Sequence, residues 1–180
     1  FAFSNMMGAI GLHLAASPIV VGACVNAFYI GGNFGMLAGI RRHLHLAPRW
    51  GWGAALVSGV LAVHALPVMQ GAPLARLLAF TPIVCAIDLA AARLLWRRGE
   101  DEVRASYLPL IMLQLLAALQ QAVRLAVMAA AASDPSNPTY GQYVRTSGAL
   151  ATLLYVSLAT MCCALIVTHQ QTLALRRASL

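Results

Sequence analysis

Residues 150–167 read LATLLYVSLATMCCALIV and contain no charged side chain, and the sequence then runs on as THQQTLALRR to Arg177. A transmembrane helix needs about 20 apolar residues to cross roughly 30 Å of hydrocarbon. Because the bilayer core holds no water to bond the backbone, an α-helix is the natural form for such a segment. This stretch therefore predicts a membrane-spanning helix.

The rest of the chain has the same character. The 180 residues are 61% hydrophobic and 9% charged, whereas a soluble domain has roughly 45–50% apolar and about 25% charged residues. These figures exclude a soluble globule, and they exclude disorder, which needs low hydrophobicity and high charge. Alternation with period two is absent, so the sequence predicts an all-α, polytopic transmembrane bundle. Breaks rich in proline, glycine or charge divide it into about six helices, at 1–16, 18–40, 51–70, 74–96, 106–131 and 143–172.

The basic residues predict the orientation. The formal net charge is +7, and all twelve basic residues are arginine. If all six helices span, one side carries Arg41, Arg42, Arg49, Arg93, Arg97, Arg98, Arg104, Arg176 and Arg177. The other side carries Arg76, Arg124 and Arg145. The positive-inside rule places the richer side, and with it the C-terminus, in the cytoplasm. We therefore attribute the charge to membrane orientation and expect the lipid bilayer, not nucleic acid, as the partner.

The last predicted helix is longer than a span requires. Residues 168–177 are polar yet favour helix, and a span needs only about 20 residues. One interpretation is a helix that projects into the cytoplasm and passes on a conformational signal, with 173–180 as the start of a stalk. The other is a snorkelling end anchored by Arg176 and Arg177.

Ionisable groups inside the membrane are costly, so each is a functional hypothesis. Four basic side chains fall at similar outer depth on different predicted helices: His64, Arg76, Arg124 and Arg145. If these helices converge, the four line a cationic vestibule for an anionic or polar small ligand, since arginine presents a planar fork of donors. Alternatively, Arg76 and Arg145 are interface anchors, and Arg124 bonds to backbone carbonyls or to Gln120 and Gln121.

Three further polar residues lie deeper in the predicted bundle. Asp88 is in the middle of the 74–96 helix, and Arg93, Asn33 and Gln114 are possible partners. The functional interpretation is a proton-sensitive or helix-coupling switch. The alternative is a set of hydrogen-bonded packing residues, because polar side chains join helices within membranes.

Other motifs carry less chemistry. His13 and His64 are weak candidates for a metal or haem site, because they fall at one depth. Neither CxxCH nor HExxH occurs, so haem and copper are not expected in this chain. His43 and His45 are expected to be solvated in the basic loop. The GxxxG spacing of Gly35 and Gly39 predicts close helix packing.

Several segments resemble the multi-pass membrane sensory regions of bacterial GGDEF diguanylate cyclases. The resemblance is carried by NFGMLAGIRR (33–42), by RLL (76–78), by AARLLWRR (91–98), by Arg124 and by LALRRASL (173–180), which is similar to the stalk that precedes a GGDEF domain. His43 departs from the pattern, which usually has an aromatic residue there. No GGDEF signature occurs, so no catalytic residue is assigned in this chain.

The resemblance implies a homodimeric sensor in the bacterial inner membrane that relays a signal to a cytoplasmic domain making cyclic di-GMP. It implies seven or eight helices in the whole protein, so that one or two precede this chain, and a catalytic domain after Leu180. GTP and Mg²⁺ would belong to that domain. The alternatives are a sensor module of a histidine kinase, a haem-binding, metal-binding or transport protein, and a structural anchor.

Overall fold

A computed structural model describes residues 18–70, 73–98, 104–133 and 138–179. This part of the chain is helical and contains no strand, which confirms the all-α bundle. The helices are α2 (Pro18–His43), α3 (Trp50–His64), α4 (Pro67–Gln70), α5 (Pro73–Arg98), α6 (Arg104–Ser133) and α7 (Pro138–Ala178). The helix predicted at 1–16 lies outside the described residues.

Four of the helices are long and apolar enough to cross a membrane: α2, α5, α6 and α7. The chain is thus a multi-pass membrane protein by length and composition. Each of the four extends beyond its predicted bounds. The largest extension is in α7, which has 41 residues and continues as helix through most of the predicted stalk.

The segment predicted as one helix over 51–70 is divided. α3 ends at His64 after 15 residues, and the four-residue α4 begins at Pro67. Proline has no N–H to donate to the carbonyl of Val63, and its ring clashes with that carbonyl, so the helix cannot continue through it. α3 rises about 22 Å, less than the roughly 30 Å of hydrocarbon.

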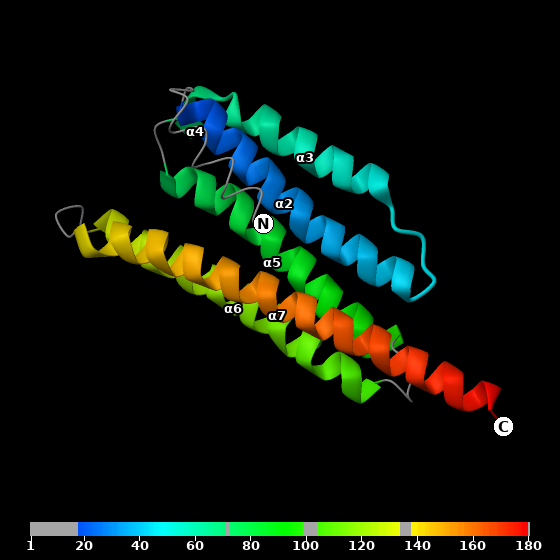
Figure 1. Cartoon of the computed structure of the whole chain (residues 1–180). Coiled ribbons are helices and arrows are strands. Elements are labelled where there is room, and N and C mark those ends of the chain that lie inside the picture. The colour runs from blue at the N-terminus through cyan, green and yellow to red at the C-terminus, as the bar shows by residue number, and fades with distance from the viewer. Residues whose placement is uncertain (1–17, 71–72, 99–103, 134–137, 180) are drawn as a thin grey trace.

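α2, α5 and α7 run in one direction, and α3 and α6 run in the opposite direction (Figure 1). The C-terminal ends of α2, α5 and α7 therefore share one end of the bundle with the N-terminal ends of α3 and α6. We call this the arginine end, because nine of the twelve arginines belong to it. It also carries the three tryptophans, Trp50, Trp52 and Trp96, each of which is more than half exposed.

Two buried clusters hold the helices together, and α5 contributes to both. One joins α2, α3 and α5 through residues such as Ile30, Phe34, Val60 and Val84. The other joins α5, α6, α7 and the end of α2, through residues such as Leu95, Leu110 and Ile166. α5 is therefore the central helix of the described bundle, with α3 and α7 on different sides of it.

Close packing falls on different glycines from those predicted. Within the described residues, no neighbouring atom lies within 4 Å of a Cβ built on Gly35 or Gly39, so that interpretation of the GxxxG spacing was wrong here. A Cβ on Gly31 would instead lie 3.3 Å from Val57 of α3. A Cβ on Gly53 would lie 2.5 Å from the ring of Phe34. These two positions let α2 and α3 approach each other.

Gly53→Ala is expected to destabilise the protein by about 1–3 kcal/mol, because the added methyl group overlaps the buried Phe34 ring. Gly59→Ala on the same helix is the control, since no described atom would lie near its Cβ. It should leave stability unchanged or raise it by up to about 1 kcal/mol. Unfolding in micelles of rising SDS fraction, followed by circular dichroism, measures both. Equal stabilities of the two variants would contradict the packing described.

Candidate functional site

A cavity of about 230 Å³ lies within the membrane-spanning part of the bundle, between α2, α5, α6 and α7. Its apolar walls include Leu113, Leu116, Leu154 and Leu158. Its polar lining comes from all four helices and consists of Tyr29, Asn33, Asp88, Gln120, Gln121, Thr152 and Tyr155. So many polar groups in one place within an apolar bundle make this cavity the candidate site.

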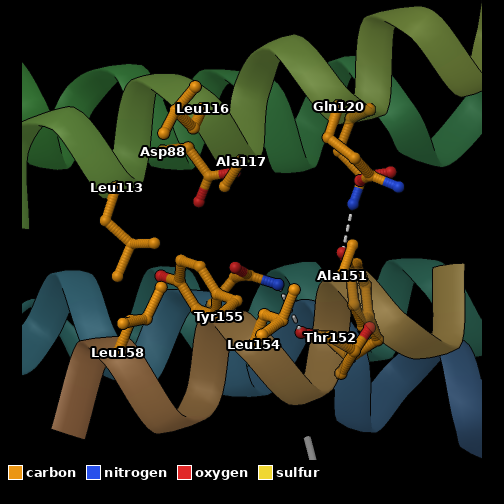
Figure 2. A pocket seen from close by; sticks show the side chains of 13 residues that line it. Asp88, Leu113, Leu116, Ala117, Gln120, Ala151, Thr152, Leu154, Tyr155 and Leu158 are labelled. Atoms are coloured by element: carbon orange, nitrogen blue, oxygen red, sulfur yellow. Dashed lines mark hydrogen bonds between the residues drawn. The ribbon is translucent and has the colours of Figure 1, made fainter. Parts of the chain in front are cut away.

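Asp88 is the acidic group of the cavity. α5 holds it among apolar residues of both clusters, and its side chain is only 2% exposed. Figure 2 shows the carboxyl group directed from α5 into the space between α6 and α7. Its Oδ2 atom has no hydrogen-bond partner among the described residues. A buried carboxyl oxygen without a partner is the group most in need of a ligand here.

Hydrogen bonds around the cavity link three helices. The hydroxyl of Tyr155 on α7 donates to Oε1 of Gln114 on α6, at 3.1 Å. Nε2 of Gln121, also on α6, donates to the hydroxyl of Tyr29 on α2. Asn33 donates to the backbone carbonyl of Tyr29, at 2.9 Å. A shift of α7 would therefore disturb polar contacts at the cavity wall.

The three residues predicted to couple helices lie around this one site. Asp88 and Asn33 line the cavity, and Gln114 bonds to its lining residue Tyr155. The Nε2 atoms of Gln114 and Gln120 are buried and have no partner in the described chain. The sequence did not indicate Tyr29, Tyr155 or Thr152, because each reads as an ordinary packing residue of an apolar helix.

The predicted cationic vestibule comprises four residues, and the structure describes the side chains of three of them. Arg124 donates from Nη1 to Oε1 of Gln121, at 3.3 Å, which is one of the alternatives given for it. Nη1 of Arg76 lies 3.7 Å from the Cβ position of Gly22 on α2. The side chain of Arg145 lies outside the described residues. Neither Arg76, Arg124 nor His64 lines the cavity, so the anionic ligand stays a prediction.

His64 is a core residue with both ring nitrogens hydrogen-bonded. Its Nδ1 lies 3.1 Å from the carbonyl oxygen of Val60, and its Nε2 lies 3.1 Å from the side-chain amide of Asn26. The carbonyl can only accept, so Nδ1 carries the proton and Nε2 accepts from the amide. The ring also stacks on Phe80, with centroids 4.9 Å apart.

The metal interpretation rested on His64 together with His13, and His13 lies outside the described residues. In the part of the chain that the structure describes, no three His, Cys, Asp or Glu side chains are grouped to hold a metal ion.

A second polar group lies at the arginine end, and we call it the polar junction: His43, Ser106, Tyr107, His169 and Gln170. His43 Nε2 lies 3.1 Å from the Tyr107 hydroxyl and 3.3 Å from Gln170 Nε2. Ser106 bonds to His169. The junction thus joins α2, α6 and α7 where α7 leaves the buried cluster.

The expectation that His43 is solvated was wrong, because its side chain is half-buried and meets the edge of the Tyr107 ring. The sequence feature that could have indicated this contact is depth in the membrane, because polar residues of three predicted helices fall at one level near the arginine end.

Comparison of the chain with protein-family models, with curated proteins and with solved structures finds no match in any of the three. The resemblance to sensory regions of diguanylate cyclases therefore stays a prediction. α7 contributes residues to both the cavity and the polar junction.

Replacing Tyr155 and Gln114, singly and together, tests whether their hydrogen bond stabilises the contact between α6 and α7. Tyr155→Phe and Gln114→Leu should each lower the free energy of unfolding by about 1 kcal/mol. The double variant should lose less than the sum, with a coupling energy of about 0.6 kcal/mol and at most about 1.7 kcal/mol. The measurement is a double-mutant cycle in SDS-containing micelles. Strict additivity would show that this hydrogen bond contributes nothing.

Proposed function

We propose that this chain is a membrane sensory and transmission module, in which α7 carries the state of the cavity to the arginine end of the bundle. One observation supports the proposal above all. The same helix supplies Thr152, Tyr155 and Leu158 to the cavity wall and His169 and Gln170 to the polar junction. A change at either place is therefore a change in the position of α7.

The length of α7 makes such a relay mechanically reasonable. Tyr155 and Gln170 are fifteen residues apart, which is about 22 Å along an α-helix. All 41 residues of α7 form one uninterrupted helix, about 60 Å long and twice the thickness of the hydrocarbon core. A ligand moves such a helix only if it binds one of its positions better than the other.

The proposed output is a cytoplasmic domain that follows α7 and makes cyclic di-GMP, as the resemblance implies. A homodimer would place two copies of α7 side by side and set the distance between two such domains. GTP and Mg²⁺ would bind to that domain. The same module could equally serve a histidine kinase, and the measurement below distinguishes the two.

Full-length protein in native membranes provides the test of the relay. Tyr155→Phe changes the cavity wall, and Gln170→Leu changes the polar junction. We expect each to alter cyclic di-GMP formation from GTP by about fivefold or more, a usual size for coupling between sites. Leu165→Ala is the control, because Leu165 lies between the two positions on α7 and is 60% exposed.

Phosphate incorporation from ATP is measured in the same membranes. If the variants change phosphate incorporation and no cyclic di-GMP is formed, the output domain is a kinase. Unchanged output from both variants at normal expression would contradict the relay and favour a structural anchor.

We also propose that the arginine end faces the bacterial cytoplasm. Nine arginines at this end against three elsewhere satisfy the positive-inside rule. The exposed tryptophans at the same end are typical of a membrane–water interface. In this orientation, α7 ends in the cytoplasm, and the connection between α6 and α7 is external.

Single cysteines in a background without the four natural ones test the orientation. Ser179→Cys should react with a membrane-impermeant maleimide only after the cells are opened. Ser136→Cys, between α6 and α7, should react in intact cells. The reverse pattern would mean that α7 ends outside, which is incompatible with a cytoplasmic output.

A further inference from the structure

Asp88 brings an acidic group into the bundle without the basic partner that would usually accompany it. Its side chain is 2% exposed, and Oδ2 forms no hydrogen bond within the described chain. No ion pair to Asp88 is formed by any residue in the described ranges. Arg93, the arginine of α5 that was a predicted partner, has an exposed side chain, and Arg124 is bonded to Gln121. Burial of an unpaired acidic group is costly in hydrocarbon, and a cationic ligand would remove that cost.

The groups around Asp88 suit the rest of such a ligand. The side chains of Tyr29 and Tyr155 line the same cavity, and phenol rings attract an adjacent cation through their faces. The leucines of α6 and α7 provide apolar contact. Gln120 offers a buried Nε2 donor that no described residue accepts. Figure 2 shows Gln120 on the same side of the cavity as Asp88 but farther along it.

We infer that the cavity binds a small organic amine, with its ammonium group at Asp88 and a hydrogen-bond acceptor at Gln120. An ammonium group meeting a carboxylate forms a charge-assisted hydrogen bond. A free amine meeting the carboxylic acid takes its proton and forms the same neutral pair, so no other reactant is needed. Neither the cationic vestibule nor a bound metal is involved.

The size of the cavity selects small ligands. A cavity of about 150 Å³ accommodates benzene, so the 230 Å³ here suits one ring with a short aminoalkyl chain.

The opening of the cavity indicates how a ligand reaches it. Leu116 of α6 and Leu154 of α7 line the cavity and are 56% and 62% exposed. The space between α6 and α7 is therefore open at the surface of the bundle, which faces lipid at this depth. An amine with an apolar ring partitions into the bilayer and passes between these two helices.

The inference rests on the proposed sensory function, so binding and output are measured separately. The probes are tyramine and tyrosol, which share a phenol ring and differ in carrying an amine or a hydroxyl group. Calorimetric titration of full-length protein in phosphatidylcholine nanodiscs should show tyramine binding at least tenfold more tightly than tyrosol. Asp88→Asn should remove this preference, whereas Asp101→Asn, in the connection between α5 and α6, should retain it.

Leu116→Trp provides a second variant that leaves Asp88 intact. The larger side chain should fill the opening between α6 and α7 and weaken tyramine binding, which keeps the test informative if Asp88→Asn does not fold. Equal binding of the two probes to the natural protein would overturn the inference, and so would undiminished tyramine binding to both variants.

Cyclic di-GMP formation with tyramine separates the two proposals. Binding without any change of output would support the amine site and contradict the sensory function. An output that responds to Tyr155→Phe and Gln170→Leu, in protein that does not bind tyramine, would support the sensory function and overturn the amine site.

Discussion

Hydrocarbon offers no hydrogen-bond partner, so every polar group within this bundle depends on another part of the chain or on a ligand. The backbone meets this condition by forming helices throughout the described residues. The side chains meet it unevenly. His64 bonds to Asn26, and Tyr155 donates to Gln114, although Nε2 of Gln114 has no partner among the described residues. Oδ2 of Asp88 has no partner there either, and Asp88 lines a cavity that leaves room for a ligand.

The distribution of polar contacts gives the bundle two unequal halves. α2, α3 and α5 are packed around apolar side chains and the stacked His64–Phe80 pair. α7 shares an apolar cluster with α5 and α6 and is also held by polar groups near the cavity and at the polar junction. Since hydrogen bonds between membrane helices are individually weak, α7 can exchange these polar contacts at low cost. The proposed relay therefore uses the helix whose interface combines apolar packing with exchangeable hydrogen bonds.

Much of the fold follows from the sequence because membrane helices are selected by length and apolarity, which are local properties. The positions of α2, α5, α6 and α7 are of this kind. The break at Pro67 was not predicted, because the sequence on both sides of this proline is apolar and suggests one continuous helix. The proximity of Asp88, Asn33 and Gln114 could be predicted from their similar depth in the membrane. The cavity could not be predicted, because depth gives no information on the rotation of each helix about its axis. For the same reason, depth alone did not show that the ring of His64 faces α2 and α5.

The short α3 has a consequence for the surrounding membrane. Trp50 and Trp52 are exposed at one end of this helix, where indole rings settle at the level of the lipid headgroups. Because these tryptophans anchor one end of α3 at the headgroups, its 15 residues are too short to cross the whole hydrocarbon core. The uncovered part of the hydrocarbon is then in the opposite leaflet, next to α4. Hydrophobic mismatch costs a fraction of a kcal/mol per Å and is relieved when the bilayer thins locally. Acyl-chain length would therefore act on the α3 flank of the protein far more than on the flank formed by α6 and α7.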